Sequence, residues 1–199
     1  MSIKAAAFDY GGVIAFFQGQ EAMKDLADLA EIEVSLMNRI YWESRPGYDL
    51  GQMDGRNYFK SILAGVGVFP DPDLLEKMFL CDLESWSHVN PETEKLIRDV
   101  KSSGLKTAIL SNIAPDHLNH YKKTLPVFGL FDAAVFSCET GAIKPDEKIY
   151  RILLSQMACE AEELVFFDDR EINVAAAAVL GIKAFLWDGA EAARKILEL

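Results

Sequence analysis

The sequence predicts an α/β fold, a doubly wound parallel sheet with an inserted all-helical unit. Five short apolar runs have the length of strands, and each is closely followed by a polar or glycine-containing segment. Runs that are apolar throughout are typical of parallel strands buried on both faces. These predicted strands are Ala5–Phe8, Thr107–Leu110, Ala133–Phe136, Leu164–Phe167 and Lys183–Leu186. Helix-like segments separate the later runs, and this alternation is typical of doubly wound sheets.

Three of these helix-like segments carry recognisable start or stop signals. Asn90 is a candidate N-cap with a proline directly after it, and Pro145 precedes the second segment. Gly181 provides a C-terminal stop for the third. The predicted helices are Pro91–Lys101, Asp146–Met157 and Asn173–Leu180.

The region between the first two strands does not follow this alternation. Its candidate helices are Glu21–Ala30, Val34–Tyr41, Gly55–Ala64 and Asp73–Cys81, with no convincing strand between them. They are either ordinary surface helices or a separate unit, and we favour the latter because the region directly follows the first strand and its turn. We therefore expect an α/β core domain of residues 1–15 and 87–199, with a helical cap domain of residues 16–86.

Composition restricts the class of partner. The 199 residues are half hydrophobic and carry a net charge of −11, which suits a packed protein and disfavours nucleic acid or an anionic membrane as partner. The negative charge of the protein would also repel an anionic small substrate, so a bound divalent cation would help to recruit it. The sequence carries no signal for the oligomeric state.

The cysteines and the apolar runs suggest a location. Cys81, Cys138 and Cys159 are odd in number and lack the C-x-x-C spacing, which predicts reduced, buried thiols in a cytosolic protein. Asp9 interrupts the N-terminal apolar run before a signal-peptide core forms, and no run reaches the roughly 18 apolar residues of a transmembrane helix. We expect a cytoplasmic protein with no membrane partner.

Asp9 is the first candidate for chemistry. It follows the run Ala5–Phe8 directly, where open α/β sheets bind their ligands. Gly11 and Gly12 allow the backbone to turn tightly and approach a ligand closely. A lone aspartate after a strand is more often a turn or cap residue; the functional interpretation is a nucleophile or a metal ligand.

Two later strand ends carry neutral and cationic groups. Ser111 and Asn112 follow the second run, and Ser111 is predicted to cap a helix, to donate to a phosphoryl oxygen, or to do both. Lys144 lies in a glycine-bearing loop and is restricted by Pro145 to extended backbone conformations. Most loop lysines are merely solvated, but a cation here would neutralise a transferring phosphoryl group.

The fourth strand ends in the adjacent carboxylates Asp168 and Asp169. Adjacent like charges repel, and packing explains them poorly. A divalent cation with oxygen ligands would relieve the repulsion, so this pair predicts a metal site.

Together these four segments resemble the four motifs of the haloacid dehalogenase-like hydrolase superfamily, in the same order. The resemblance extends over nearly the whole chain, including a helical cap inserted after the first motif. Its most specific part is Phe166–Val174, followed by Ala175–Ala178 and Leu180–Ile182. Within the superfamily the chain resembles the sugar-phosphate (glucose-1-phosphate-type) phosphatases with a small helical cap, and the phosphatase domains of some epoxide hydrolases.

The resemblance implies a Mg²⁺-dependent phosphatase acting on a small phosphorylated metabolite through an aspartyl-phosphate on Asp9. It implies metal ligation by Asp9, the main-chain carbonyl of Gly11, Asp169 and, as a further or indirect ligand, Asp168. It implies phosphoryl contacts from Ser111 and Lys144, orientation of the group by Asn112, and close backbone approach at Gly12. Asn173 stands where many relatives carry another acid.

One departure bears on catalysis. Most phosphatases of this superfamily have a second aspartate two residues after the nucleophile, acting as general acid and base, and here Gly11 occupies that position. A general acid typically contributes about 10²–10⁴ in rate. Two alternatives therefore stay open: a 2-haloacid dehalogenase in which Asp9 attacks carbon without a metal, and a catalytically weak phosphate-binding or regulatory protein.

Substrate contacts from the cap are weaker predictions. Asp49 and Asp54 are candidate acids, although a helix end and an N-cap explain them better, and Arg45 is a further candidate. His117 and His120 are interpreted as surface residues. Four aromatic residues, Phe16, Phe17, Tyr41 and Trp42, are interpreted as packing between cap and core, with Phe16 and Phe17 near the mouth of the cleft. The substrate itself is not specified by the sequence.

Overall fold

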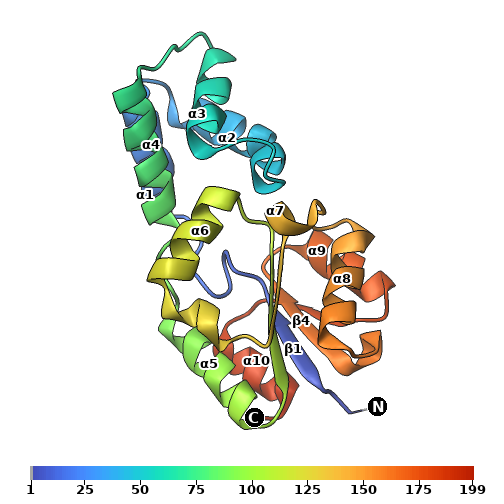
Figure 1. The fold of residues 1–199 in the computed structure, drawn as a ribbon. Helices are drawn as coiled ribbons and strands as arrows, with labels where there is room; N and C mark the ends of the chain where they lie inside the picture. The colour runs from blue at the N-terminus through green and yellow to red at the C-terminus, as the bar shows by residue number, and fades with distance from the viewer. Residues whose placement is uncertain (1) are drawn as a thin grey trace.

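The computed structural model describes residues 2–199 and contains a five-stranded, fully parallel sheet (Figure 1). Its strands are β1 (Ala5–Phe8), β2 (Lys106–Ser111), β3 (Ala133–Phe136), β4 (Leu164–Asp168) and β5 (Lys183–Leu186). The strand order is β3-β2-β1-β4-β5. Because the chain builds outwards from β1 first in one direction and then in the other, the sheet is doubly wound, which confirms the predicted fold class.

Helices cover both faces of this sheet. On one face lie α5 (Pro91–Ser102) and α10 (Ala190–Leu197), and on the other lie α8 (Glu147–Met157) and α9 (Glu171–Val179) (Figure 1). In β1, Ala6 and Phe8 join the apolar cluster of the first face, and Ala5 and Ala7 join that of the second. The central strand β1 is apolar at every position because both of its faces are buried.

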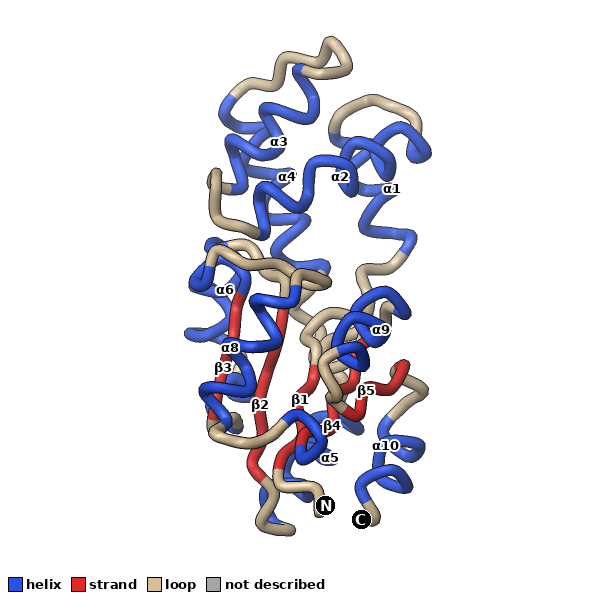
Figure 2. The backbone as a smooth tube through the Cα atoms, turned by 90° about the vertical axis from the view of Figure 1, so that its right-hand side faces the viewer, coloured by secondary structure: helices blue, strands red, loops and turns tan. Residues whose placement is uncertain are grey.

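The helical insert comprises four helices beyond the carboxyl ends of the strands (Figure 2). They are α1 (Gln20–Leu29), α2 (Val34–Asp49), α3 (Gly55–Ala64) and α4 (Pro72–Ser85). Asp54 and Asp71 cap α3 and α4 by accepting hydrogen bonds from the backbone N–H groups of Asn57 and Leu74. The structural role considered for Asp54 is therefore confirmed.

Several helices differ from the predictions. Helix α2 continues to Asp49 rather than ending at Tyr41, and its last turns contain Pro46. The helices α6 (Pro115–Thr124), α7 (Ser137–Thr140) and α10, together with the 3₁₀ turns Pro126–Leu130 and Ala161–Glu163, were not predicted. Tertiary packing stabilises the longer α2, since the turns beyond the predicted end at Tyr41 contain buried side chains such as Tyr48.

The cysteines differ from the prediction in their exposure. The prediction that the cysteines are buried is wrong: Cys81, Cys138 and Cys159 are unpaired and each partly exposed. Within residues 2–199, no helix combines the length and the apolar character needed to cross a membrane.

Candidate active site

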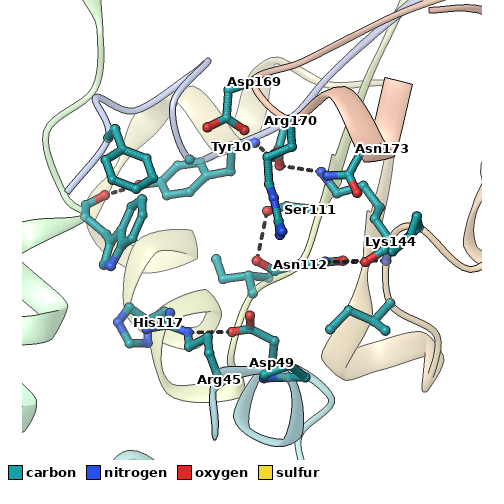
Figure 3. Close-up of a pocket in the computed structure, with 18 of the residues that line it drawn as sticks. Tyr10, Arg45, Asp49, Ser111, Asn112, His117, Lys144, Asp169, Arg170 and Asn173 are labelled. Atoms are coloured by element: carbon teal, nitrogen blue, oxygen red, sulfur yellow. Dashed lines mark hydrogen bonds and ion pairs between the residues drawn. The ribbon is translucent and has the colours of Figure 1, made fainter. Parts of the chain in front are cut away.

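A cavity of about 590 Å³ lies between the carboxyl edge of the sheet and the helical insert (Figure 3). Asp9 follows β1, Ser111 ends β2, Asp169 follows β4, and Lys144 lies in the connection after β3. All four side chains line the cavity, as do Gly11 and Asn112. The parallel strands thus bring residues from distant parts of the sequence together.

Two predicted site residues lie behind the cavity wall. Asp168 is completely buried and accepts hydrogen bonds from the site residues around it. Gly12 packs against Asp169. Neither residue is part of the cavity lining.

Lys144 is held between two carboxylates. Its Nζ atom lies 2.8 Å from Oδ1 of Asp9 and 2.6 Å from Oδ2 of Asp168, and it donates a hydrogen bond to the carbonyl of Leu110. The lysine is almost fully buried. Burial alone would lower the pKa of Lys144, but the two carboxylates outweigh it and raise that pKa, so the side chain is an ammonium.

Asn112 positions the backbone of Lys144. Its Oδ1 accepts a hydrogen bond from the N–H of Lys144 at 2.8 Å, and its Nδ2 donates to the carbonyl of the same residue at 3.0 Å. The Lys144–Pro145 peptide bond is cis. Ser111 does not cap a helix, because α6 begins after Ala114, and its hydroxyl is on the cavity wall.

Asp9 is a buried carboxylate with fixed orientation. Its Oδ1 accepts a hydrogen bond from the N–H of Tyr10 at 2.7 Å and contacts Lys144. Burial raises the pKa of Asp9, and Lys144 opposes that rise while Asp168 and Asp169 add to it. Any further positive charge at this position would therefore favour the ionised form that a nucleophile needs.

The acidic cluster fits a divalent cation. Asp9, Asp168 and Asp169 each provide one carboxylate oxygen, and these three atoms lie within 4.8 Å of one another. Burial raises the pKa of Asp169, and the charge of Asp168 raises it further. One lysine leaves the charge of three carboxylates only partly compensated, and hard oxygen donors of this kind are the ligands that Mg²⁺ prefers.

Within this cluster the three carboxylates are not equivalent. Oδ2 of Asp168 accepts from Lys144, while its Oδ1 accepts from the N–H of Arg170 and from Nδ2 of Asn173, both at 2.9 Å. The side chain of Asp168 thus orients its neighbours, and Asn173, which contributes no carboxylate, acts on Asp168 through a hydrogen bond.

The structure explains why glycines occupy positions 11 and 12, since a side chain at either position would clash with a neighbouring residue. Gly12 has a φ of 76°, and a Cβ atom there would lie 2.6 Å from Oδ2 of Asp169. A Cβ atom on Gly11 would lie 2.9 Å from Cζ3 of Trp86. The indole of Trp86 therefore fills the space into which a side chain at position 11 would project.

The opposite wall of the cavity comes from the helical insert. Arg45 and Asp49 of α2 line the cavity and form an ion pair of 2.9 Å between Nε and Oδ1 (Figure 3). Behind them lies Asp82, 3.5 Å from Arg45 and 3.2 Å from Nε2 of His117. Although burial alone would raise it, the charges of Arg45 and His117 lower the pKa of Asp82 to about 2.

The prediction for the two histidines is half wrong. His117 is 1 % exposed, lies on α6 and lines the cavity, whereas His120 is exposed. The buried acid that pairs with His117 is 35 residues away in sequence and belongs to α4. Only the packing of α4 against α6 reveals this pair.

Four further residues of the cavity lining carry no catalytic signal in the sequence and were not predicted. Tyr10, Trp86, Tyr121 and Ile172 line the cavity, and apolar or aromatic residues of this kind are more often core residues. Of the aromatic residues considered for the cap, Phe17 and Trp42 line the cavity, Tyr41 is fully buried, and Phe16 is exposed but not part of the lining.

Comparison with known proteins agrees with this geometry. A family model described as haloacid dehalogenase-like hydrolase matches residues 3–181. Mouse acyl-CoA dehydrogenase family member 10 is 36% identical over 109 residues, which are 54% of this chain but only 10% of that protein. Sesquiterpene phosphatase astK of Aspergillus oryzae is 25% identical over 187 residues, covering 91% of this chain and 88% of the relative.

Solved structures share the fold. A HAD family enzyme of Bacteroides thetaiotaomicron superposes with a TM-score of 0.79 and 18% identity over 98% of both chains, and this enzyme has also been solved with magnesium and inorganic phosphate. The L-2-haloacid dehalogenase RSc1362 superposes equally well, with a TM-score of 0.79 and 14% identity over the full length of both chains. The shared architecture therefore does not separate the two chemistries.

Proposed function

The chain belongs to the haloacid dehalogenase-like hydrolases, and on this basis we propose that it is a Mg²⁺-dependent phosphatase acting on a small phosphate monoester. The observation that carries the proposal is the position of Lys144, whose ammonium contacts Asp9 beside a cluster of three carboxylates. A site in which the carboxylate attacks a carbon atom and displaces a halide needs no acidic cluster. The similarity to a phosphatase over 88% of that relative's length supports the same conclusion.

In this proposal Asp9 is the nucleophile. Its carboxylate attacks phosphorus in line, the P–O bond to the alcohol breaks on the opposite side, and water then hydrolyses the aspartyl-phosphate. Lys144 and the hydroxyl of Ser111 bind the phosphoryl oxygens, and Lys144 neutralises charge as the transition state forms. Asn112 holds the Lys144 backbone in place. Because Gly12 has no side chain, the carboxylate of Asp169 can approach the turn that follows Asp9.

The metal site would be formed by Asp9, the main-chain carbonyl of Gly11 and Asp169. Asp168 acts mainly by holding Lys144, because both of its oxygens already accept hydrogen bonds. When bound, Mg²⁺ supplies positive charge for the phosphoryl oxygens and for the ionised carboxylates.

Leaving-group protonation is the unusual step, since Gly11 provides no acid. Esters whose alcohol needs little protonation, such as aryl and anomeric sugar phosphates, are therefore expected to react faster than ordinary alkyl esters. Residues 16–86 serve as a cap domain over a core of residues 1–15 and 87–199, and the cap encloses the small phosphorylated substrate. The acidic surface disfavours nucleic acid, and a cytoplasmic location suits the unpaired thiols.

The test is hydrolysis of p-nitrophenyl phosphate and acetyl phosphate with Mg²⁺ and with EDTA. We compare the native chain with Asp9→Asn, and use Asp73→Asn, an exposed position on α4, as the matched control. Turnover should require the metal, persist in the control and disappear in Asp9→Asn.

Two outcomes would contradict the proposal. Asp9-dependent chloride release from L-2-chloropropionate in EDTA, without phosphate release from either phosphate compound, would assign the protein to the dehalogenases. Saturable phosphate binding without turnover of either compound would assign a binding or regulatory role.

A further inference from the structure

Three aromatic side chains meet on the insert side of the cavity. Phe17 stacks on Trp42 with ring centroids 6.1 Å apart and meets Trp86 edge-on at 5.3 Å. Trp42 and Trp86 are perpendicular at 6.3 Å. All three line the cavity, and Phe17 and Trp42 remain 57% and 38% exposed. Exposed aromatic rings that line a cavity offer apolar surface that a ligand can cover.

Trp86 stands where the family's general acid would project. A Cβ atom on Gly11 would lie 2.9 Å from Cζ3 and 3.4 Å from Cε3 of this indole. The hydroxyl of Tyr10 donates to the carbonyl of Trp86 at 2.8 Å and helps to hold that residue. At this position the cavity thus presents an apolar edge instead of a carboxyl group.

The two charged side chains of the insert that line the cavity, Arg45 and Asp49, pair with each other. Nε of Arg45 donates to Oδ1 of Asp49, and its Nη1 donates to the hydroxyl of Tyr41 and contacts Asp82. A sugar needs free donors and acceptors for its hydroxyls, because unpaired buried polar groups are costly. The insert therefore offers the cavity more aromatic surface than free hydrogen-bonding groups.

We propose that Phe17, Trp42 and Trp86 form an aromatic subsite that binds an apolar organic group esterified to the phosphate. The proposal rests on the phosphatase function above. In-line attack by Asp9 directs the leaving alcohol away from the sheet, and the insert forms that side of the cavity. A second cavity of about 670 Å³ also has Phe17 and Trp42 in its lining, so the two rings border both cavities.

The test compares 3-phenylpropyl phosphate with glycerol 3-phosphate, both monoesters of primary alcohols, in Mg²⁺ buffer. The native chain should prefer the phenylpropyl ester in kcat/KM by about tenfold or more. Phe17→Ala and Trp42→Ala should each reduce this preference about tenfold, mainly through KM. Phe69→Ala, which removes an 84% exposed ring outside the cavity lining, should leave the preference unchanged.

A native preference for glycerol 3-phosphate, or equal losses on both esters in the two variants, would overturn the aromatic subsite while leaving phosphatase activity established. If neither of these esters nor p-nitrophenyl phosphate is turned over, the proposed function fails instead, and tryptophan fluorescence titration with 3-phenylpropyl phosphate then tests the subsite. Saturable binding that is weakened about tenfold in Phe17→Ala supports it. Binding no tighter than that of glycerol 3-phosphate refutes it.

Discussion

The Nζ atom of Lys144 lies 2.6 Å from Oδ2 of Asp168, and both side chains are buried. Asp9 contacts the same ammonium at 2.8 Å. One lysine thus compensates two carboxylates that would otherwise be buried as unpaired charges. Removing one partner of a buried ion pair costs more than the pair contributes, because the remaining charge stays desolvated.

Lys144→Met should therefore lower the free energy of unfolding by about 3–5 kcal/mol in metal-free buffer. Urea unfolding measures the loss, and Lys148→Met, at an exposed position of α8, is the matched control. Added Mg²⁺ should stabilise the variant more than the native chain, since a cation replaces the missing charge. A variant as stable as the native chain in EDTA would show that these contacts do not stabilise the fold.

Asp82 should make stability fall at acid pH. Its pKa in the folded state is about 2, against 3.8 as the ordinary value, so the native state binds its proton less readily than the unfolded state. The resulting contribution of about 2 kcal/mol is present above pH 4 and is lost as the pH falls through 2. The difference in urea unfolding between the native chain and Asp82→Asn should be constant from pH 7 to 5 and shrink below pH 4. A difference independent of pH down to 2 would contradict this.

Gly11→Ala should destabilise the fold by about 1–3 kcal/mol, because its methyl group would overlap the Trp86 ring. Gly129→Ala is the control, since a Cβ atom there meets nothing within 4 Å. The loss should be smaller when Gly11→Ala is combined with Trp86→Leu, and this coupling is measured by a double-mutant cycle of unfolding free energies. Additive effects would show that the two positions do not compete for space.

Gly12→Ala should impair metal binding more than a change of one methyl group suggests. The residue has a left-handed φ of 76°, costing an alanine about 1–2 kcal/mol, and its Cβ would displace the carboxylate of Asp169. We expect Mg²⁺ affinity to fall about 10–100-fold in calorimetric titration. Gly19→Ala, at an unhindered position with φ of −68°, should bind the metal as tightly as the native chain.

Much of the fold followed from local patterns. Ala5–Phe8, Ala133–Phe136 and Lys183–Leu186 are strands with the predicted bounds, because their short length and the helix-like segments that alternate with the later runs favour strands over helices. Asn90 caps α5 as expected, since its side chain accepts from a free backbone N–H group. The extension of α2 to Asp49 was missed because tertiary packing, rather than propensity, maintains its last turns.

The sequence by itself determined the parallel α/β architecture, the family, and the choice of Asp9, Ser111, Lys144 and Asp169 as candidate site residues. These carry polar groups at strand ends, and parallel topology alone places such ends on one edge. Tertiary structure decided what surrounds them. Tertiary structure alone supplies the partner of His117, the two hydrogen bonds between Asn112 and Lys144, and the indole of Trp86 beside Gly11, all of which join residues at least 32 positions apart. Contacts between separate elements depend on packing distances and side-chain directions, and no local pattern in one sequence encodes them.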